Sequence, residues 1–166
     1  LLPVVQYFMK ILLPLGVFQI DYYRGWSEEK DLLEILATNL ERDRHFKFSQ
    51  AGPQRAELRF KIAGQLAVDV LSRGQIKLLV FALRLAQAKL LQEQNGKECL
   101  FLIDDLPSEL DRNKRELLVQ VLQEFGAQTF ITSADRESLQ AMFQKIAPAE
   151  QALFKVDNGK IDCEIS

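Results

Sequence analysis

The chain has 166 residues, of which 48% are hydrophobic and 27% are charged, and its net charge is −2 at pH 7. This length is enough for one domain with a hydrophobic core, and the composition is typical of a folded globular protein. A net charge so close to zero excludes a global basic field, so any contact with nucleic acid must come from a local patch or from parts outside this sequence.

The cysteines and the apolar start argue against secretion and against a membrane partner. The two cysteines, Cys99 and Cys163, form no disulfide framework in the sequence pattern. The apolar start is interrupted by Pro3, Lys10 and Pro14, is too short to span a bilayer and lacks the pattern of a signal peptide. The chain does not begin with Met, so we expect a fragment of a longer cytoplasmic protein.

The first third of the chain predicts a helix, a strand and a second helix. The apolar residues of 4–13 predict a helix that Pro14 ends, and the alternation over 17–23 predicts a strand. Ser27 is a good N-cap, so we expect a helix after it that offers apolar side chains for burial. These side chains are Leu32, Leu33, Ile35, Leu36 and Leu40.

The middle of the chain predicts a hairpin and a long buried helix. Apolar and basic residues alternate over 58–62, and residues 66–70 return after a turn at 63–65, which is typical of a β-hairpin. From Arg73 to about Gln92 the sequence is apolar on most faces, which predicts a helix that is buried on several sides.

The last third predicts a parallel crossover followed by a hairpin. The nearly continuous apolar run 98–103 is typical of a central strand. Asp111 can cap a helix that Gly126 ends, and a further strand over 129–132 completes a strand–helix–strand unit. A turn at residues 157–159 predicts a hairpin of residues 154–156 and 160–165. The fold class is therefore α/β with a mixed sheet.

Two acids follow the predicted central strand. Asp104 and Asp105 lie at its carboxyl end, the edge at which ligands bind in open α/β sheets. In phosphoryl-transfer sites one such carboxylate holds Mg²⁺, and a second can orient or deprotonate the attacking water. An exposed acidic turn without a ligand is the alternative.

Two further segments could bind anions or could simply cap helices. Ser72 and Gly74 open the long helix, whose free N–H groups attract phosphate, and glycine allows a close approach to the backbone. Ser108 to Asp111 precede the next helix. In both places an N-cap in a plain turn is the alternative.

Basic side chains gather in two places. Arg73, Lys77 and Arg84 fall on one helical face. A second cluster consists of Arg42, Arg44 and Lys47. Either cluster could meet phosphates, and a solvated face is the alternative for each.

Taken in this order, the segments resemble the RecF family of DNA replication and repair proteins, relatives of the SMC-type ATPases. The specific stretches are Leu71-Ser72-Arg73-Gly74-Gln75, Ala82-Leu83-Arg84-Leu85-Ala86-Gln87 and Leu102-Ile103-Asp104-Asp105. Supporting stretches are Tyr23–Trp26, Asn39–Arg44 and Gly52–Leu58. The resemblance implies the C-terminal portion of an ABC/SMC-type ATPase head. Residues 1–50 would be part of a helical second lobe, and 51–166 the C-terminal half of the head with signature, Walker B and D-loop.

The resemblance also implies roles for individual residues in a site for ATP and Mg²⁺. The signature residues Ser72, Gly74 and Gln75 would bind the ATP held by a second protomer. Asp104 would belong to the Mg²⁺ shell, and Asp105 would occupy the position of the catalytic carboxylate. Ser108 and Asp111 would belong to the D-loop, which crosses the dimer interface.

The chain departs from the family pattern in three ways. No Gly-x-x-x-x-Gly-Lys-Ser/Thr phosphate loop is present in the sequence. Gln54 stands where the family has His in a Gly-Pro-His-Arg motif, and Ser133 stands where ABC ATPases commonly have a switch His. The chain therefore carries only part of a nucleotide site, and we expect no ATP hydrolysis by the chain alone.

The function implied by the resemblance is that of a recombination mediator in DNA repair, DNA replication and the SOS response. Such a protein dimerises on DNA gaps or junctions with ATP, hydrolyses ATP slowly, works with RecO and RecR and helps to load RecA. The alternatives are a head fragment of another SMC-like or transporter ABC ATPase, and a non-enzymatic interaction module.

Overall fold

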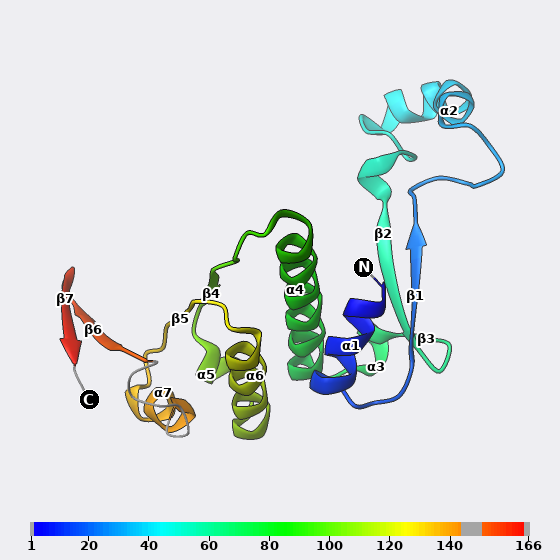
Figure 1. Cartoon of the computed structure of the whole chain (residues 1–166). Coiled ribbons are helices and arrows are strands. Elements are labelled where there is room, and N and C mark those ends of the chain that lie inside the picture. Colours follow the sequence, from blue (N-terminus) through cyan, green and yellow to red (C-terminus); the bar gives the residue numbers. More distant parts are fainter. Residues whose placement is uncertain (1, 144–150, 165–166) are drawn as a thin grey trace.

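A computed structural model describes residues 2–143 and 151–164 (Figure 1). The first half contains α1 (Leu2–Leu12), β1 (Phe18–Tyr23), α2 (Leu32–Phe46), β2 (Glu57–Ile62), β3 (Gln65–Leu66) and α3 (Ala67–Val70). The second half contains α4 (Arg73–Asn95), β4 (Phe101–Ile103), α5 (Leu106–Glu109), α6 (Arg112–Phe125), β5 (Thr129–Ile131), α7 (Arg136–Phe143), β6 (Leu153–Asp157) and β7 (Lys160–Glu164). Among the described helices, none combines the length and apolar character that a membrane span requires.

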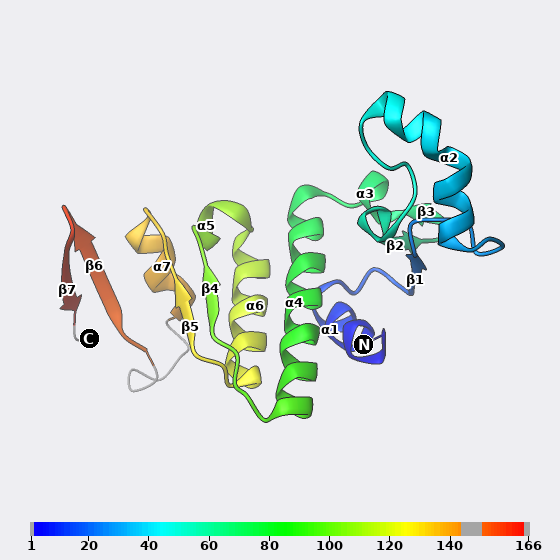
Figure 2. The same ribbon diagram turned by 90° about the horizontal axis from the view of Figure 1, so that it is seen from above.

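The hydrophobic core is built around α4, which lies between α1 and α6 in both views (Figures 1 and 2). Ser72 and Gly96 delimit this helix, the first through a capping box and the second in the left-handed conformation. The largest fully buried side chains of the three helices are Val5, Met9, Leu12, Leu78, Leu85 and Leu118. Each such burial stabilises the fold by roughly 1.5–3 kcal/mol. The predicted helices in residues 4–13 and 73–92 are thus confirmed.

The antiparallel strands β1 and β2 form a ribbon that carries α2 at its far end, away from the core (Figure 1). We call residues 18–62 the arm. The helix α2 begins after Asp31, whose carboxylate accepts from the Leu33 amide at 3.3 Å, so the expectation of Ser27 as its cap is wrong. Ser27 instead accepts from the Glu29 amide in a local turn.

The expected burial of the apolar face of α2 is also wrong. No residue of this helix is buried, and Leu33 is 74% exposed. The apolar side chains suit a packed face, but in the described structure they are exposed or only partly buried.

The predicted return strand of the first hairpin is nearly absent. Of the segment that follows β2, Gln65 and Leu66 alone pair with that strand, and the chain then enters the short helix α3. Ala67, which is 2% exposed, lies in the core. The strand pairing ends where the helix begins. There Ala67 is buried, and the Leu71 amide donates a helical hydrogen bond to the Ala67 carbonyl at 2.9 Å.

The predicted parallel crossover is confirmed, because β4 and β5 pair in parallel with α5 and α6 between them. The expectation of a central strand is wrong, because among the described strands β4 pairs only with β5. Ile103 is buried, whereas Leu102, on the other face, is 76% exposed.

The described strands form three separate sheets, so the expected mixed sheet is also wrong. The ribbon of β1, β2 and β3 and the hairpin of β6 and β7 are antiparallel, and neither bonds to β4 or β5. The predicted C-terminal hairpin is confirmed, except that Ile165 lies outside the described residues. The division at residues 50 and 51 stays a prediction; β1 and β2 pair across it.

Candidate functional site

Asp104 and Thr132 lie side by side where β4 and β5 end. The Thr132 amide donates to the Ile103 carbonyl at 3.0 Å, which extends the parallel ladder by one bond. The Thr132 hydroxyl donates to Asp104 Oδ1 at 2.5 Å and accepts from the Asp105 amide at 3.0 Å. One hydroxyl therefore bridges the two acids that the sequence singled out.

Thr132 was missed by the sequence reasoning. The sequence could have indicated Thr132 only by its position directly after the second strand of a predicted parallel pair. The carboxyl ends of such strands meet at one edge of the sheet.

Asp105 turns the chain sharply into α5. Its backbone is left-handed, with φ 45° and ψ 43°, a conformation that costs roughly 1–3 kcal/mol for a residue other than glycine. The Ser108 hydroxyl donates to Asp105 Oδ2 at 2.6 Å, and the next residue, Leu106, is 1% exposed in the core. The structure thus brings Asp104, Asp105 and Ser108 together on an exposed edge.

Ser72 and Gln75 engage each other at the start of α4. Ser72 Oγ accepts from the Gln75 amide at 3.3 Å, and the Ser72 amide donates to Gln75 Oε1 at 2.8 Å. These bonds satisfy two amides at the helix start, so the capping alternative is confirmed for these two side chains. Binding of phosphate by the same residues stays a prediction.

Gly74 lets the first turn of α4 approach the start of α6. A Cβ atom on Gly74 would lie 3.4 Å from Lys114 Nζ and 3.9 Å from Leu110 Cδ2. A longer side chain at residue 74 would have to displace these atoms. The first turn of α4 and the segment that precedes α6 are therefore neighbours, which the sequence did not predict.

Asp111 caps α6, as predicted. Its carboxylate accepts from the Lys114 amide at 3.0 Å and pairs with Lys114 Nζ at 2.7 Å. The hydrogen bond from the Lys114 side chain, followed by that from the Lys114 amide, lowers the pKa of Asp111 below its ordinary 3.8. A nucleotide role for Asp111 stays a prediction.

The two residues that depart from the family pattern both have local partners. Gln54 Nε2 donates to the Ala51 carbonyl at 3.1 Å and braces the loop before β2. Ser133 Oγ accepts from the Asp135 amide at 2.9 Å, in the turn that leads to α7. These contacts make both residues parts of turns.

The donor set at the edge of β4 suits Mg²⁺ bound together with phosphate rather than a separate metal centre. In the described part of the chain no group of three or more His, Cys, Asp or Glu side chains could hold a metal. Mg²⁺ commonly uses one or two carboxylates and takes its other ligands from water and phosphates. Asp104 and Asp105 meet that requirement.

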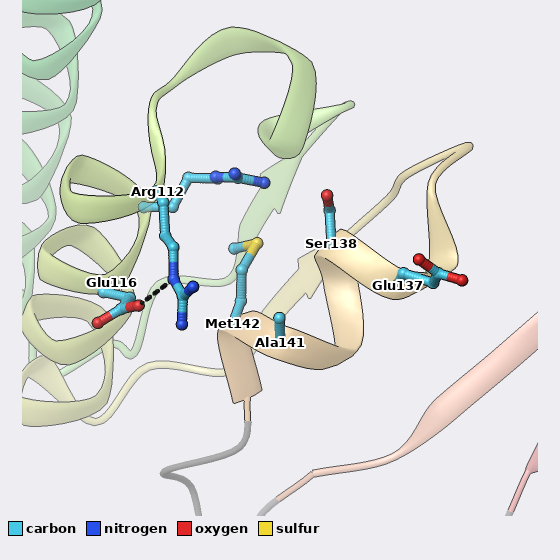
Figure 3. Close-up of a pocket in the computed structure, with 7 residues that line it drawn as sticks. Arg112, Glu116, Glu137, Ser138, Ala141 and Met142 are labelled. Atoms are coloured by element: carbon cyan, nitrogen blue, oxygen red, sulfur yellow. Dashed lines mark hydrogen bonds and ion pairs between the residues drawn. The ribbon is translucent and has the colours of Figure 1, made fainter.

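A cavity of about 260 Å³ lies between α6 and α7 (Figure 3). Arg112 follows Asp111 directly, and its Nε pairs with Glu116 at 3.0 Å on one wall. Ser138 and Met142 of α7 face it from the other side. The sequence did not predict this cavity.

Residues 24–159 match the family model described as the RecF/RecN/SMC N terminal domain. The chain belongs to the RecF/RecN/SMC family. Its mixed α/β fold accordingly matches the ATPase head region of that family.

The DNA replication and repair protein RecF of Pseudomonas fluorescens (strain SBW25) is 45% identical over 159 residues. That match covers 96% of this chain and 43% of the relative. RecF of Pseudomonas putida (strain KT2440) gives the same identity and coverage. The chain therefore spans less than half the length of the curated relatives it matches.

A solved structure described as the recombination mediator protein RecF with ATP in the RecFOR pathway has the same fold. It has a TM-score of 0.67 and 21% identity, and the match covers 98% of this chain and 44% of that one. At this identity the likeness concerns the fold alone.

The comparison corrects one expectation, which is the position of the chain within a protein of the RecF/RecN/SMC family. The chain was expected to be the C-terminal portion of such a protein, but the model that covers residues 24–159 describes an N-terminal domain. The expectation rested on the missing phosphate loop, and the absence of one motif does not place a segment within a longer protein.

Proposed function

We propose that this chain supplies part of the nucleotide site of a RecF-like ATPase that acts in DNA replication and repair. The observation that carries the proposal is the edge at which Thr132 bridges Asp104 and Asp105. The approach of Gly74 to Leu110 and Lys114 supports it, because two segments with expected roles at one interface lie together.

At the acidic edge the two carboxylates have separate tasks. Asp104 would hold Mg²⁺, and the hydroxyl of Thr132 fixes its orientation. The Asp105 carboxylate would accept a proton from the attacking water, and the Ser108 hydroxyl keeps it in position by donating to Oδ2. The metal ion, when bound, would neutralise the charge of the phosphates.

The surface formed by Ser72, Gly74, Gln75, Ser108 and Asp111 faces ATP on a second copy of the protein. Ser72 and Gln75 keep the first turn of α4 regular through their capping box. The free N–H groups of that turn then meet phosphate, an arrangement that helix N-termini favour. Dimerisation is therefore ATP-dependent.

The relatives support the proposed partners. The relatives are DNA replication and repair proteins, and the similar solved structures are described as RecF with ATP or ATPrS in the RecFOR pathway. The protein acts in the cytoplasm on single-strand gaps or junctions, with RecO and RecR, and helps to load RecA. Hydrolysis is slow and serves release.

A phosphate loop is missing from this sequence, so the chain alone binds ATP weakly. The loop normally supplies many backbone donors to the phosphates. The proposed role therefore needs a phosphate loop from another polypeptide segment.

A chimera tests the proposal. The matching stretch of the Pseudomonas fluorescens RecF is replaced by this chain, and ATP affinity, turnover and dimerisation are measured. We expect Asp105→Asn to slow turnover by about 10²- to 10⁴-fold with nearly unchanged ATP affinity. Asp104→Asn should also weaken Mg²⁺-dependent binding, and Asp162→Asn, an exposed acid of the C-terminal hairpin, is the control.

Ser72→Arg in the same chimera should abolish the ATP-dependent dimer while leaving nucleotide binding to the monomer intact. A dimer at the wild-type level would contradict the contact with a second copy. That result would favour the alternative function, a non-enzymatic interaction module. The capping roles of Ser72, Gln75 and Asp111 are consistent with it.

A further inference from the structure

Aromatic and basic side chains lie together at the end of the arm. Arg42 lies over the ring of Phe46 at 5.9 Å, and Arg55 over that of Phe48 at 5.1 Å. The two rings are 6.2 Å apart. These four residues form one continuous row, which we call the arm strip. It lies on a different part of the molecule from the acidic edge (Figure 1).

The backbone holds the strip in place. Lys47 ends α2 in the left-handed conformation, with φ 61° and ψ 20°, and so turns the chain between the two rings. Asp43 Oδ1 accepts from the Gln50 amide at 3.1 Å, and Gln54 braces the same loop. The rings are therefore ordered before any ligand arrives, which reduces the entropy lost on binding.

The strip is exposed and locally basic. Phe46 is 48% and Phe48 is 51% exposed, so neighbouring side chains leave about half of each residue accessible. Residues 42–55 contain one acid, Asp43, against four bases. The bases are Arg42, Arg44, Lys47 and Arg55. The nearby ion pair of Glu41 and Arg44, at 2.8 Å, is mostly exposed and weak.

We infer that the arm strip binds single-stranded DNA. Exposed rings beside cations are what unpaired bases and their phosphates require: the bases stack on the rings, and the phosphates meet the guanidinium groups. An acidic peptide would use the same cations but would have no need of two adjacent exposed rings. The inference rests on the proposed function only in taking DNA as the ligand.

Anisotropy of a labelled thymidine oligonucleotide, with this chain and without nucleotide, tests the inference. Phe46→Ala with Phe48→Ala should weaken binding by about 5- to 150-fold for each base that loses its stacking partner. Phe48→Trp should retain binding. Leu33→Ala, an exposed apolar residue of the same helix, is the matched control and should bind as the wild type does.

Charge is tested separately. Arg55→Gln should weaken binding and reduce the slope of log affinity against log salt by about 0.7 for a single lost phosphate contact. Arg84→Gln, on the other basic face, should leave both quantities unchanged. Circular dichroism of every variant confirms that the helices are intact.

Three outcomes would overturn the inference. They are wild-type affinity of the double alanine variant, equal and ring-independent binding of a duplex, and competition by polyglutamate at the same concentration as by the oligonucleotide. The assay contains no ATP, so failure of the chimera to hydrolyse ATP leaves its result unaffected.

Discussion

The helices around α4 and the arm differ in how their apolar residues are used. In α4 one set of apolar side chains is enclosed, and Leu85 and Ala82 are fully buried. In α2 the helical pattern is just as apolar at several positions, but none of its residues is buried. The same local signal therefore leads to a core in one region and to an exposed surface in the other.

This difference assigns different work to the two regions. The acidic edge is anchored to the core through Leu106 and Ile103, which are both buried. The arm is held by a narrow ribbon, and its ion pair of Asp21 and Lys61, at 2.8 Å, is partly exposed. Positions that need fixed geometry lie on the core, and the arm presents an accessible surface.

The largest expected effect comes from removing one core side chain. Leu85→Ala should lower the free energy of unfolding by about 2–5 kcal/mol, because a buried leucine leaves a cavity. Leu33→Ala in α2 should change it by less than about 0.5 kcal/mol. Urea unfolding measures both, and similar losses would mean that α2 is packed in solution.

A second substitution acts on the arm alone. A Cβ atom on Gly25 would lie 2.0 Å from the Gly52 carbonyl oxygen, and its φ of 103° is strained for alanine. Gly25→Ala should cost about 1–3 kcal/mol and speed hydrogen exchange in the arm but not in α4. Gly64→Ala is the control, since φ there is also positive, at 82°, with no atom within 4 Å. If both variants behave alike, the close approach of Gly25 and Gly52 is unimportant.

A third substitution tests the acidic edge. Thr132→Val keeps the shape but removes the hydroxyl that bridges Asp104 and Asp105, so we expect a loss of about 1–2 kcal/mol in unfolding free energy. Thr132→Ser should restore most of it. A neutral Thr132→Val would show that water replaces the bridge without cost.

The smallest effect concerns pH. Asp111 has a pKa below its ordinary 3.8 because Lys114 bonds to its charged form. Its contribution to stability is therefore present above pH 3.8 and is lost as pH falls through the lowered folded pKa. Asp111→Asn, which can still cap the helix, should differ from the wild type at neutral pH and converge with it in acid.

The control is Lys114→Met, which should reduce the same pH dependence by removing the side-chain partner, while the amide of residue 114 still bonds to Asp111. The urea midpoint at a series of pH values measures it. A difference between wild type and Asp111→Asn that grows in acid would reverse the assigned sign.

Local signals predicted the helices and their ends where side chains act on their own backbone. Asp111 and Gly126 were identified as the limits of α6 because both act within one turn of it. Asp31 was overlooked because Ser27 is an equally good cap by composition, and only the course of the chain distinguishes them.

Contacts between distant segments were beyond the sequence. The hydroxyl of Thr132 reaches Asp104 across 28 positions, a pairing that depends on strand register. The approach of Gly74 to Lys114 likewise depends on how α4 packs beside α6. The burial of α4 and the exposure of α2 could not be told apart from periodicity, because both patterns offer apolar faces.

Tyr23 pairs with Glu57 where the ribbon ends, so residues 24–56, the tip of the arm, form a segment inserted between two paired strand ends. The chain leaves β1 and re-enters β2 at opposed positions, so the two ends of the inserted segment are neighbours whatever lies between them. The loop-closure entropy of such a segment grows only slowly with its length. The tip could thus be shortened, extended or exchanged for another module while the ribbon keeps its register, which makes it a natural place for graft experiments.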